Sequence, residues 1–127
     1  MSSYHDLICW FRTALDRDPW GDGYLAGFGG WFRERAGIER VPDFKLASTA
    51  SGFPVAPGQR YHVVAGCIGA HSFLCIDGVV AVELFDPNPL PPAHEGHFGF
   101  GLYESHVRYE RLEVYRPAWV KVEEKYA

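Results

Sequence analysis

The chain has 127 residues, of which 47% are hydrophobic and 16% aromatic, which is enough material for one domain with one core. Its formal charge is −4 and it contains no basic run, which excludes the electrostatic pattern of a nucleic-acid-binding protein. Its apolar runs are too short for a membrane span, and its first ten residues lack the pattern of a secretory signal. We therefore expect a cytoplasmic protein that has neither nucleic acid nor a membrane as a partner.

The first half of the chain predicts strands that are separated by polar loops. Residues 6–13 (DLICWFRT) are rich in strand formers, and residues 24–31 (YLAGFGGW) are typical of a strand that contains glycines. Shorter strands are expected at residues 37–41 and 44–49. The one place where a helical turn is considered is residues 33–36.

The second half of the chain carries the clearest turn signals. Residues 61–68 and 72–76 predict a hairpin about Gly69-Ala70. Asp77-Gly78 then predicts a type I′ turn, because both central positions of that turn need a positive φ. Return strands are expected at residues 79–85, 97–103 and 106–115, and the last of these changes the parity of its apolar residues, which indicates a β-bulge near Glu110-Arg111.

About nine strands in so short a chain predict an all-β fold, an antiparallel β-sandwich that forms a single domain over residues 1–127. The three cysteines, Cys9, Cys67 and Cys75, have apolar neighbours and no C-x-x-C spacing, so we expect buried, reduced thiols.

Three motifs suggest metal or phosphate binding, and each has a simpler interpretation. Asp86-Pro87-Asn88-Pro89 offers oxygen ligands for calcium, but Asp, Asn and Pro are also the residues of a turn at a strand exit, which we prefer. His94 and His97 lie in a stretch that is not helical, so their rings need not converge. The glycines of GFGGW do not match a phosphate loop. We therefore predict neither a metal site nor a cofactor.

Short runs follow one another in a fixed order between residues 61 and 116: YHVVA, FLCIDG, FDPNPL, GHFGFGL, SHVRY and LEVY. Their order and spacing resemble the closing half of concanavalin A-like lectin/glucanase jelly rolls, and are similar to bacterial members of the 3-keto-disaccharide hydrolase type and related sugar-utilisation proteins. This resemblance implies a jelly roll, a fold that hosts lectins, hydrolases, lyases and plain binding modules.

The resemblance also implies an abbreviated sandwich. Domains of that family begin with several strands before the equivalent of DLICW, and only five residues precede it here. A sandwich without its first strands exposes apolar edges, and pairing between subunits is one way to cover them. We therefore expect a homo-oligomer, most simply a dimer.

The family's glucanases place three acids as Glu-x-Asp-x-Glu on one strand, so that all three face the cleft. This chain has no such triplet. Glu83-x-x-Asp86 and Glu110-x-x-Glu113 have odd spacing, which sends the partners to opposite faces of a regular strand. That glucanase chemistry is not expected.

Aromatic residues and an arginine are the candidates for binding a saccharide. Trp10 and Arg12 share one face of their predicted strand, where an indole can stack on a sugar ring and a guanidinium can bond its hydroxyls. Tyr24 and Trp31 belong to the same candidate set. Arg12 also matches the position of a cleft arginine in the resembling family. The alternative is that these aromatic residues lie in the core or in a subunit interface.

Two functions follow from these observations. The first is a carbohydrate-associated jelly-roll protein that binds a saccharide ligand on its concave sheet. If it is an enzyme, it would resemble glycoside hydrolases or 3-keto-glycoside hydrolases and eliminases, with Glu39 and His62 as candidate catalytic acid/base residues. The second is a non-catalytic structural or accessory β-sandwich that serves oligomeric assembly.

Overall fold

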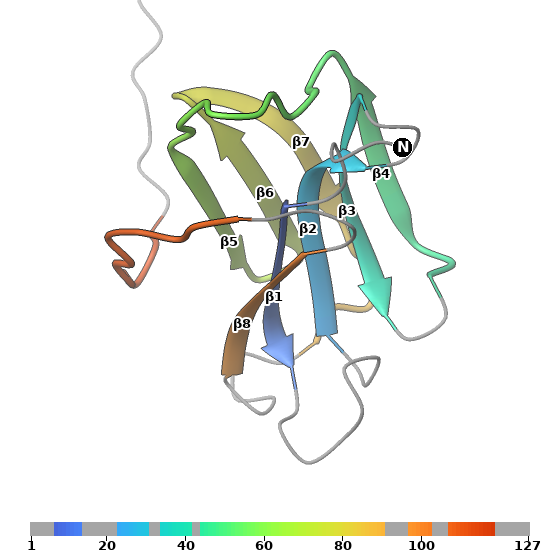
Figure 1. Ribbon diagram of the computed structural model, residues 1–127. Coiled ribbons are helices and arrows are strands. Elements are labelled where there is room, and N and C mark those ends of the chain that lie inside the picture. Colours follow the sequence, from blue (N-terminus) through green and yellow to red (C-terminus); the bar gives the residue numbers. More distant parts are fainter. Residues whose placement is uncertain are drawn as a thin grey trace, which may run out of the picture.

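The computed structural model describes residues 7–13, 23–30, 34–41, 44–90, 97–102 and 107–118. These residues form an all-β structure of two antiparallel sheets, as predicted, and contain no helix (Figure 1). No part of the described chain is therefore a helix that could cross a membrane.

The larger sheet has five strands in the order β4-β3-β2-β1-β8. The strands of this sheet are β1 (Leu7–Thr13), β2 (Gly23–Gly30), β3 (Arg35–Val41), β4 (Ala47–Ser51) and β8 (His97–Leu102). Alternate residues of its central strands face the second sheet, so that Tyr24, Ala26 and Phe28 of β2 lie fully or almost fully buried beside Ala36 and Ile38 of β3.

The smaller sheet has three strands in the order β5-β6-β7. They are β5 (Val63–Ile68), β6 (His71–Ile76) and β7 (Val79–Phe85). Ser72, Leu74 and Ile76 of β6 are buried while the residues between them are half-buried, which is the alternation of a strand with one face on a core. This sheet stacks mainly on β3 and β4 of the larger one.

Both predicted hairpin turns are present. Asp77 and Gly78 have φ values of 51° and 82°, so the type I′ prediction is confirmed, and β6 pairs with β7 on either side of the turn. Gly69 has a φ of 58° in the turn between β5 and β6. A β-carbon on Gly66 would lie 2.8 Å from Cζ of Phe73, so this glycine allows the Phe73 ring to lie across β5.

Two predicted boundaries in the first half are wrong. The fourth strand begins at Ala47 rather than at residue 44, because Phe44 has a φ of 58° and its N–H donates to the Arg40 carbonyl in the turn after β3. Arg35 and Ala36 belong to β3 instead of a helical turn, since Arg35 pairs with Ser51 and Ala36 with Ala50.

The predicted strand at residues 106–115 is also wrong for the part that is described. Residues 107–118 form no strand, and Leu112, Val114 and Tyr115 are 59%, 67% and 75% exposed. The change of parity that suggested a bulge does mark a real irregularity, because Arg111 has a φ of 54°. A strand cannot continue straight through that residue.

The three cysteines form no disulfide and are half-buried rather than fully buried as expected. Burial raises the pKa of Cys9 to about 12, and burial together with the nearby Glu83 carboxylate raises the pKa of Cys75. Both thiols are therefore protonated at neutral pH and are poor nucleophiles.

Replacing Gly78 by alanine tests the turn that connects β6 and β7. A β-carbon there meets no atom within 4 Å, so the cost comes from the positive φ alone and is about 1–2 kcal/mol in urea unfolding. Gly99→Ala is the matched control, because its β-carbon also meets open space and its φ is not positive. An equal loss of stability in the two variants would contradict this account of the turn.

Candidate functional site

The Asp-Pro-Asn-Pro segment forms a corner directly after β7, and its Asp86 is the most buried carboxylate among the described residues. Asp86 is 3% exposed, and its backbone N–H donates to the Ala70 carbonyl at 2.8 Å. Its Oδ1 accepts the Asn88 N–H at 2.9 Å, which is the local bond of an Asx turn. The preferred interpretation of this motif as a turn is confirmed.

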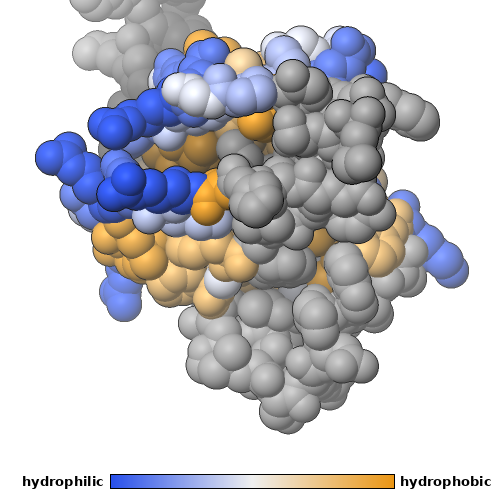
Figure 2. Space-filling view, viewed as in Figure 1, coloured by the Kyte–Doolittle hydropathy of each residue, from blue (hydrophilic) through white to orange (hydrophobic). Residues whose placement is uncertain are grey.

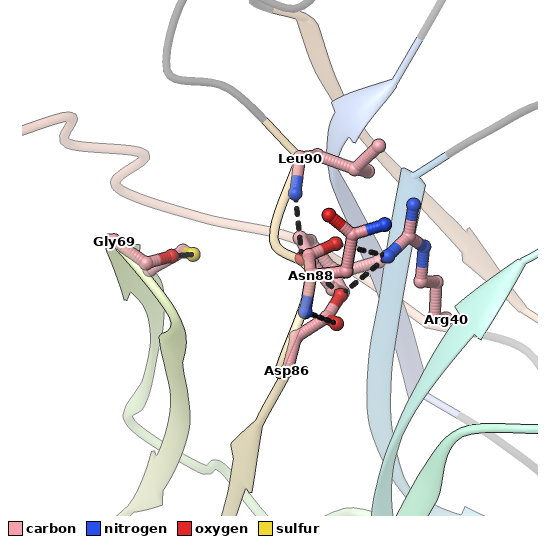
Figure 3. Close-up of polar contacts among 7 residues, drawn as sticks. Arg40, Gly69, Asp86, Asn88 and Leu90 are labelled. Carbon is pink, nitrogen blue, oxygen red and sulfur yellow. Dashed lines mark hydrogen bonds and ion pairs between the residues drawn. The ribbon is translucent and has the colours of Figure 1, made fainter.

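Two residues from the larger sheet reach the other oxygen of this carboxylate (Figure 3). The Tyr24 hydroxyl, from β2, donates to Oδ2 of Asp86 at 2.8 Å, and an Arg40 guanidinium nitrogen, from β3, donates to the same oxygen at 2.7 Å. The same Arg40 nitrogen also donates to the Asn88 carbonyl at 2.6 Å, and the Tyr24 oxygen accepts the Leu90 N–H at 3.2 Å. We call Tyr24, Arg40 and Asp86 the sheet-bridging triad.

The environment keeps the Asp86 carboxyl ionised. Burial by itself would raise its pKa, but the hydrogen bonds from Asn88 and Tyr24 and the charge of Arg40 outweigh burial and lower the pKa below its ordinary value of 3.8. Burial, opposed by the bond from Leu90 and reinforced by Asp86, raises the pKa of Tyr24 to about 12. Neither group exchanges a proton near neutral pH, so the triad fits a structural role and does not fit general acid/base work.

The described residues contain no group of three or more His, Cys, Asp or Glu side chains that could hold a metal ion. The polar atoms of Asp86 are directed to protein donors on both oxygens. The calcium interpretation of the Asp-Pro-Asn-Pro segment therefore has no support in its geometry.

The predicted saccharide-binding residues do not form one set. Tyr24 is fully buried in the core and belongs to the triad. Trp10 pairs with Leu25 and Leu25 pairs with Glu39, so the positions of Trp10 and Glu39 share one cross-strand row on the face that points away from the core. Arg12 lies on β1, but its side chain, like that of Trp10, is outside the described part, as is all of Trp31.

That outer face of the larger sheet is not uniformly open. Leu25 and Val41 are 4% and 0% exposed, yet neither belongs to the core cluster between the sheets. At Leu25 and Val41 the outer face is therefore covered and cannot serve as an open platform for a saccharide.

The two candidate catalytic residues lie on different sheets. Glu39 is a half-buried residue of β3, whereas His62 is exposed just before β5. The His62 backbone is tied to the β6–β7 turn, since its N–H donates to Oδ1 of Asp77 and its carbonyl accepts the Asp77 N–H, each at 2.8 Å. The structure does not bring Glu39 and His62 together as an acid/base pair.

A shallow groove of about 330 Å³ lies at one end of the sandwich, lined by Tyr61 and Asp77, the sequence neighbour and the hydrogen-bond partner of His62, but not by His62 itself. Its walls include Phe28, Phe53 and Tyr61, whose ring meets that of Phe28 edge-on with centroids 5.1 Å apart, and its polar groups come from Gln59 and Asp77. Sequence reasoning missed this groove, because its walls come from β2, the long loop after β4 and the β6–β7 turn.

The larger sheet extends beyond the smaller one on the side of β1 and β8. Phe98 and Phe100 of β8 pair with Phe11 and Cys9, so they face the inside of the sandwich, yet they are 48% and 42% exposed. Figure 1 places β5, an edge strand of the smaller sheet, on the same side of the molecule as β8. No strand among the described residues pairs with the outer edge of β5. We call this free edge, together with the inner face of β1 and β8, the open side.

Apolar surface is visible on this molecule as well as inside it. Figure 2 shows apolar atoms exposed at the left of the view, next to strongly polar ones. A second apolar region is the outer face of the smaller sheet, where the exposed residues Val64, Val80 and Phe85 accompany one exposed carboxylate, Glu83. Contiguous exposed apolar surface of this kind is typical of interaction sites.

Comparison of the chain with models of known protein families, with curated proteins and with solved structures gives no match in any of the three. The open side, the groove and the sheet-bridging triad are therefore interpreted from their own chemistry.

The triad predicts a specific dependence of stability on pH. Since the folded-state pKa of Asp86 lies below its unfolded value, its stabilisation is fully present above about pH 5 and is lost as the pH falls through 3.8 toward the folded pKa. Urea unfolding of the wild type and of Asp86→Asn should differ by roughly 3 kcal/mol at neutral pH, with the difference shrinking in acid. A difference that is constant with pH would contradict an ionised, stabilising Asp86.

Proposed function

We propose that this protein is a non-catalytic β-sandwich module whose function is assembly with further copies of itself. The observation that carries this proposal is the open side, where Phe98 and Phe100 face inward on the larger sheet without strands of the smaller sheet over them. Completing that layer removes apolar area from water, which stabilises association at about 25 cal/mol per Å² before the costs of binding.

The edge of β5 supports self-assembly through the same side. Edge strands of natural proteins are protected by charges, prolines or bulges, because an unprotected edge pairs with other chains. The sequence of β5, VVAGCI, has none of these charges or prolines, and Val63 and Val64 are 41% and 44% exposed. The opposite edge strand of the smaller sheet, β7, carries Glu83.

The buried ionisable groups support a role without catalysis. Asp86 and Tyr24 are bonded within the triad, and the thiols of Cys9 and Cys75 are held protonated. The Asp77 carboxylate beside His62 accepts the His62 backbone N–H, and Glu39, the other candidate, lies on the other sheet.

Saccharide binding is a second candidate function, favoured by the shallow groove. An aromatic wall of Phe53 and Tyr61 with the amide of Gln59 and the carboxylate of Asp77 has the composition of a small sugar site. The concanavalin A-like jelly roll and its hydrolase or eliminase activity remain part of this second proposal. The strands β1 to β4 and β5 to β7 follow one another in simple order, and β8 returns by a long connection to lie beside β1. This return is the feature that the sandwich shares with the Greek keys from which jelly rolls are built.

A titration with mono- and disaccharides, followed by amide chemical shifts, tests the second candidate. Binding in the groove should move the amides of residues 52–61 and of Asp77, and Tyr61→Ala should abolish the effect. Shifts at residues 9–11 and 39 would instead place the sugar on the outer row of Trp10. No shift with any sugar would remove the saccharide proposal.

Sedimentation velocity over a range of concentrations tests self-assembly. The wild type should sediment above the 14.3 kDa of a single chain, and replacing Phe98 and Phe100 by serine should weaken association at least about tenfold, since each ring buries apolar area in the contact. Phe44→Ser is the matched control, because Phe44 is a phenylalanine of similar exposure (40%) that lies in the turn after β3, on the other side of the larger sheet from β8. A wild type that remains monomeric at all concentrations would overturn the proposal.

A further inference from the structure

Residues 112–115 form an exposed segment with the sequence of a β-strand. The run Leu-Glu-Val-Tyr alternates aliphatic side chains with polar or aromatic ones, which is the pattern of a strand with one apolar face, and the Tyr115 hydroxyl donates to the Glu113 carboxylate. Leu112 and Val114 are 59% and 67% exposed, and would share one face if the run formed a strand. We call residues 112–115 the arm.

The stretch before the arm is anchored on the open side of its own chain. The Tyr109 ring lies against that of Phe100, with centroids 4.7 Å apart, and Glu110 forms an ion pair with Arg60, just before β5, at 3.5 Å. At Arg111 the φ of 54° turns the backbone. Figure 1 shows the segment that contains the arm, in orange-red, running outward from the sandwich past β5.

The open side offers an acceptor that matches the arm. Within the described residues, β5 is paired with β6 alone, which leaves the peptide groups of its other edge available to a further strand. A strand added there lies above the inner face of β8, where Phe98 and Phe100 are exposed. Such a strand needs apolar side chains on the face that covers Phe98 and Phe100, and Leu112 and Val114 of the arm are apolar.

We propose that two copies of this chain exchange arms, with residues 112–115 of each copy pairing with β5 of the other and covering its open side. The inference rests on the proposed self-assembly and names its interface. Each exchanged arm adds one strand to the smaller sheet, places Leu112 and Val114 over Phe98 and Phe100, and leaves Glu113 and Tyr115 on the outer face.

A second copy is the partner because each chain presents both surfaces of the contact, the arm and the open side. The arm is turned away from its own sandwich at Arg111, while the first half of the segment, at Tyr109, stays on β8. A two-fold axis lets the same pair of surfaces meet twice, so that both arms and both open sides are covered in one closed dimer. Strand addition of this kind obtains affinity from backbone hydrogen bonds and specificity from alternate side chains.

The experiment combines sedimentation velocity with a mixed-label NMR dimer of the full chain. Leu112→Ser together with Val114→Ser should weaken dimerisation at least about 100-fold, since two apolar side chains leave the interface. Arg116→Ser, which changes an exposed side chain directly after the arm, is the control and should retain the wild-type dissociation constant. The double variant and the control should both have the wild-type circular dichroism spectrum, because the replaced side chains are exposed.

In the mixed dimer, one copy carries ¹⁵N and the other ¹³C. Isotope-filtered NOEs should connect the Val114 methyl groups of the ¹³C-labelled copy to amides of β5 in the ¹⁵N-labelled copy. A dimer that is unaffected by the Leu112/Val114 variant, or that lacks these intermolecular NOEs, would overturn arm exchange and leave self-assembly standing. A wild type that is monomeric would overturn both proposals.

Discussion

The carboxylate of Asp86 is the interaction on which the arrangement of the two sheets depends. It follows the last strand of the smaller sheet and accepts bonds from Tyr24 and Arg40, which lie on neighbouring strands of the larger sheet. A buried charge is tolerable only where it is paired and hydrogen-bonded, so this corner fixes where β7 ends relative to β2 and β3. Because the smaller sheet is held over that half of the larger sheet, the other half, at β1 and β8, is left as the open side.

This offset links the fold to the proposed function. Asp86, Tyr24 and Arg40 are engaged in holding the sandwich together, whereas Phe98 and Phe100 are exposed where the layer over them is incomplete. The unprotected edge of β5, the inward rings of Phe98 and Phe100, and the exposed arm belong to the same side of the molecule. Assembly accounts for these features together, and the shallow groove is the separate feature that favours a small ligand.

Local signals were sufficient to predict much of the fold. Asp77-Gly78 specifies its turn because only a few residue types accept two successive positive φ values, and Asp86-Asn88 specifies a corner because the bond that closes it is local. Long-range partners could not be predicted in the same way. Nothing in the sequence around Tyr24 indicates that its hydroxyl meets a carboxylate 62 positions later, so an aromatic residue of the core was assigned to a ligand. Residues 107–115 have the side chains of a strand but pair with no strand among the residues that the structure describes, and sequence periodicity does not report whether a partner strand is present.

The central claim is that the free edge of β5 is an interface between copies. Hydrogen exchange of the β5 amides, measured at protein concentrations below and above the onset of association, tests it most directly. If β5 pairs with another copy, exchange at Val63–Ile68 slows as the concentration rises, while exchange in the β6–β7 turn stays unchanged. Exchange at β5 that is independent of concentration while the protein associates would contradict it.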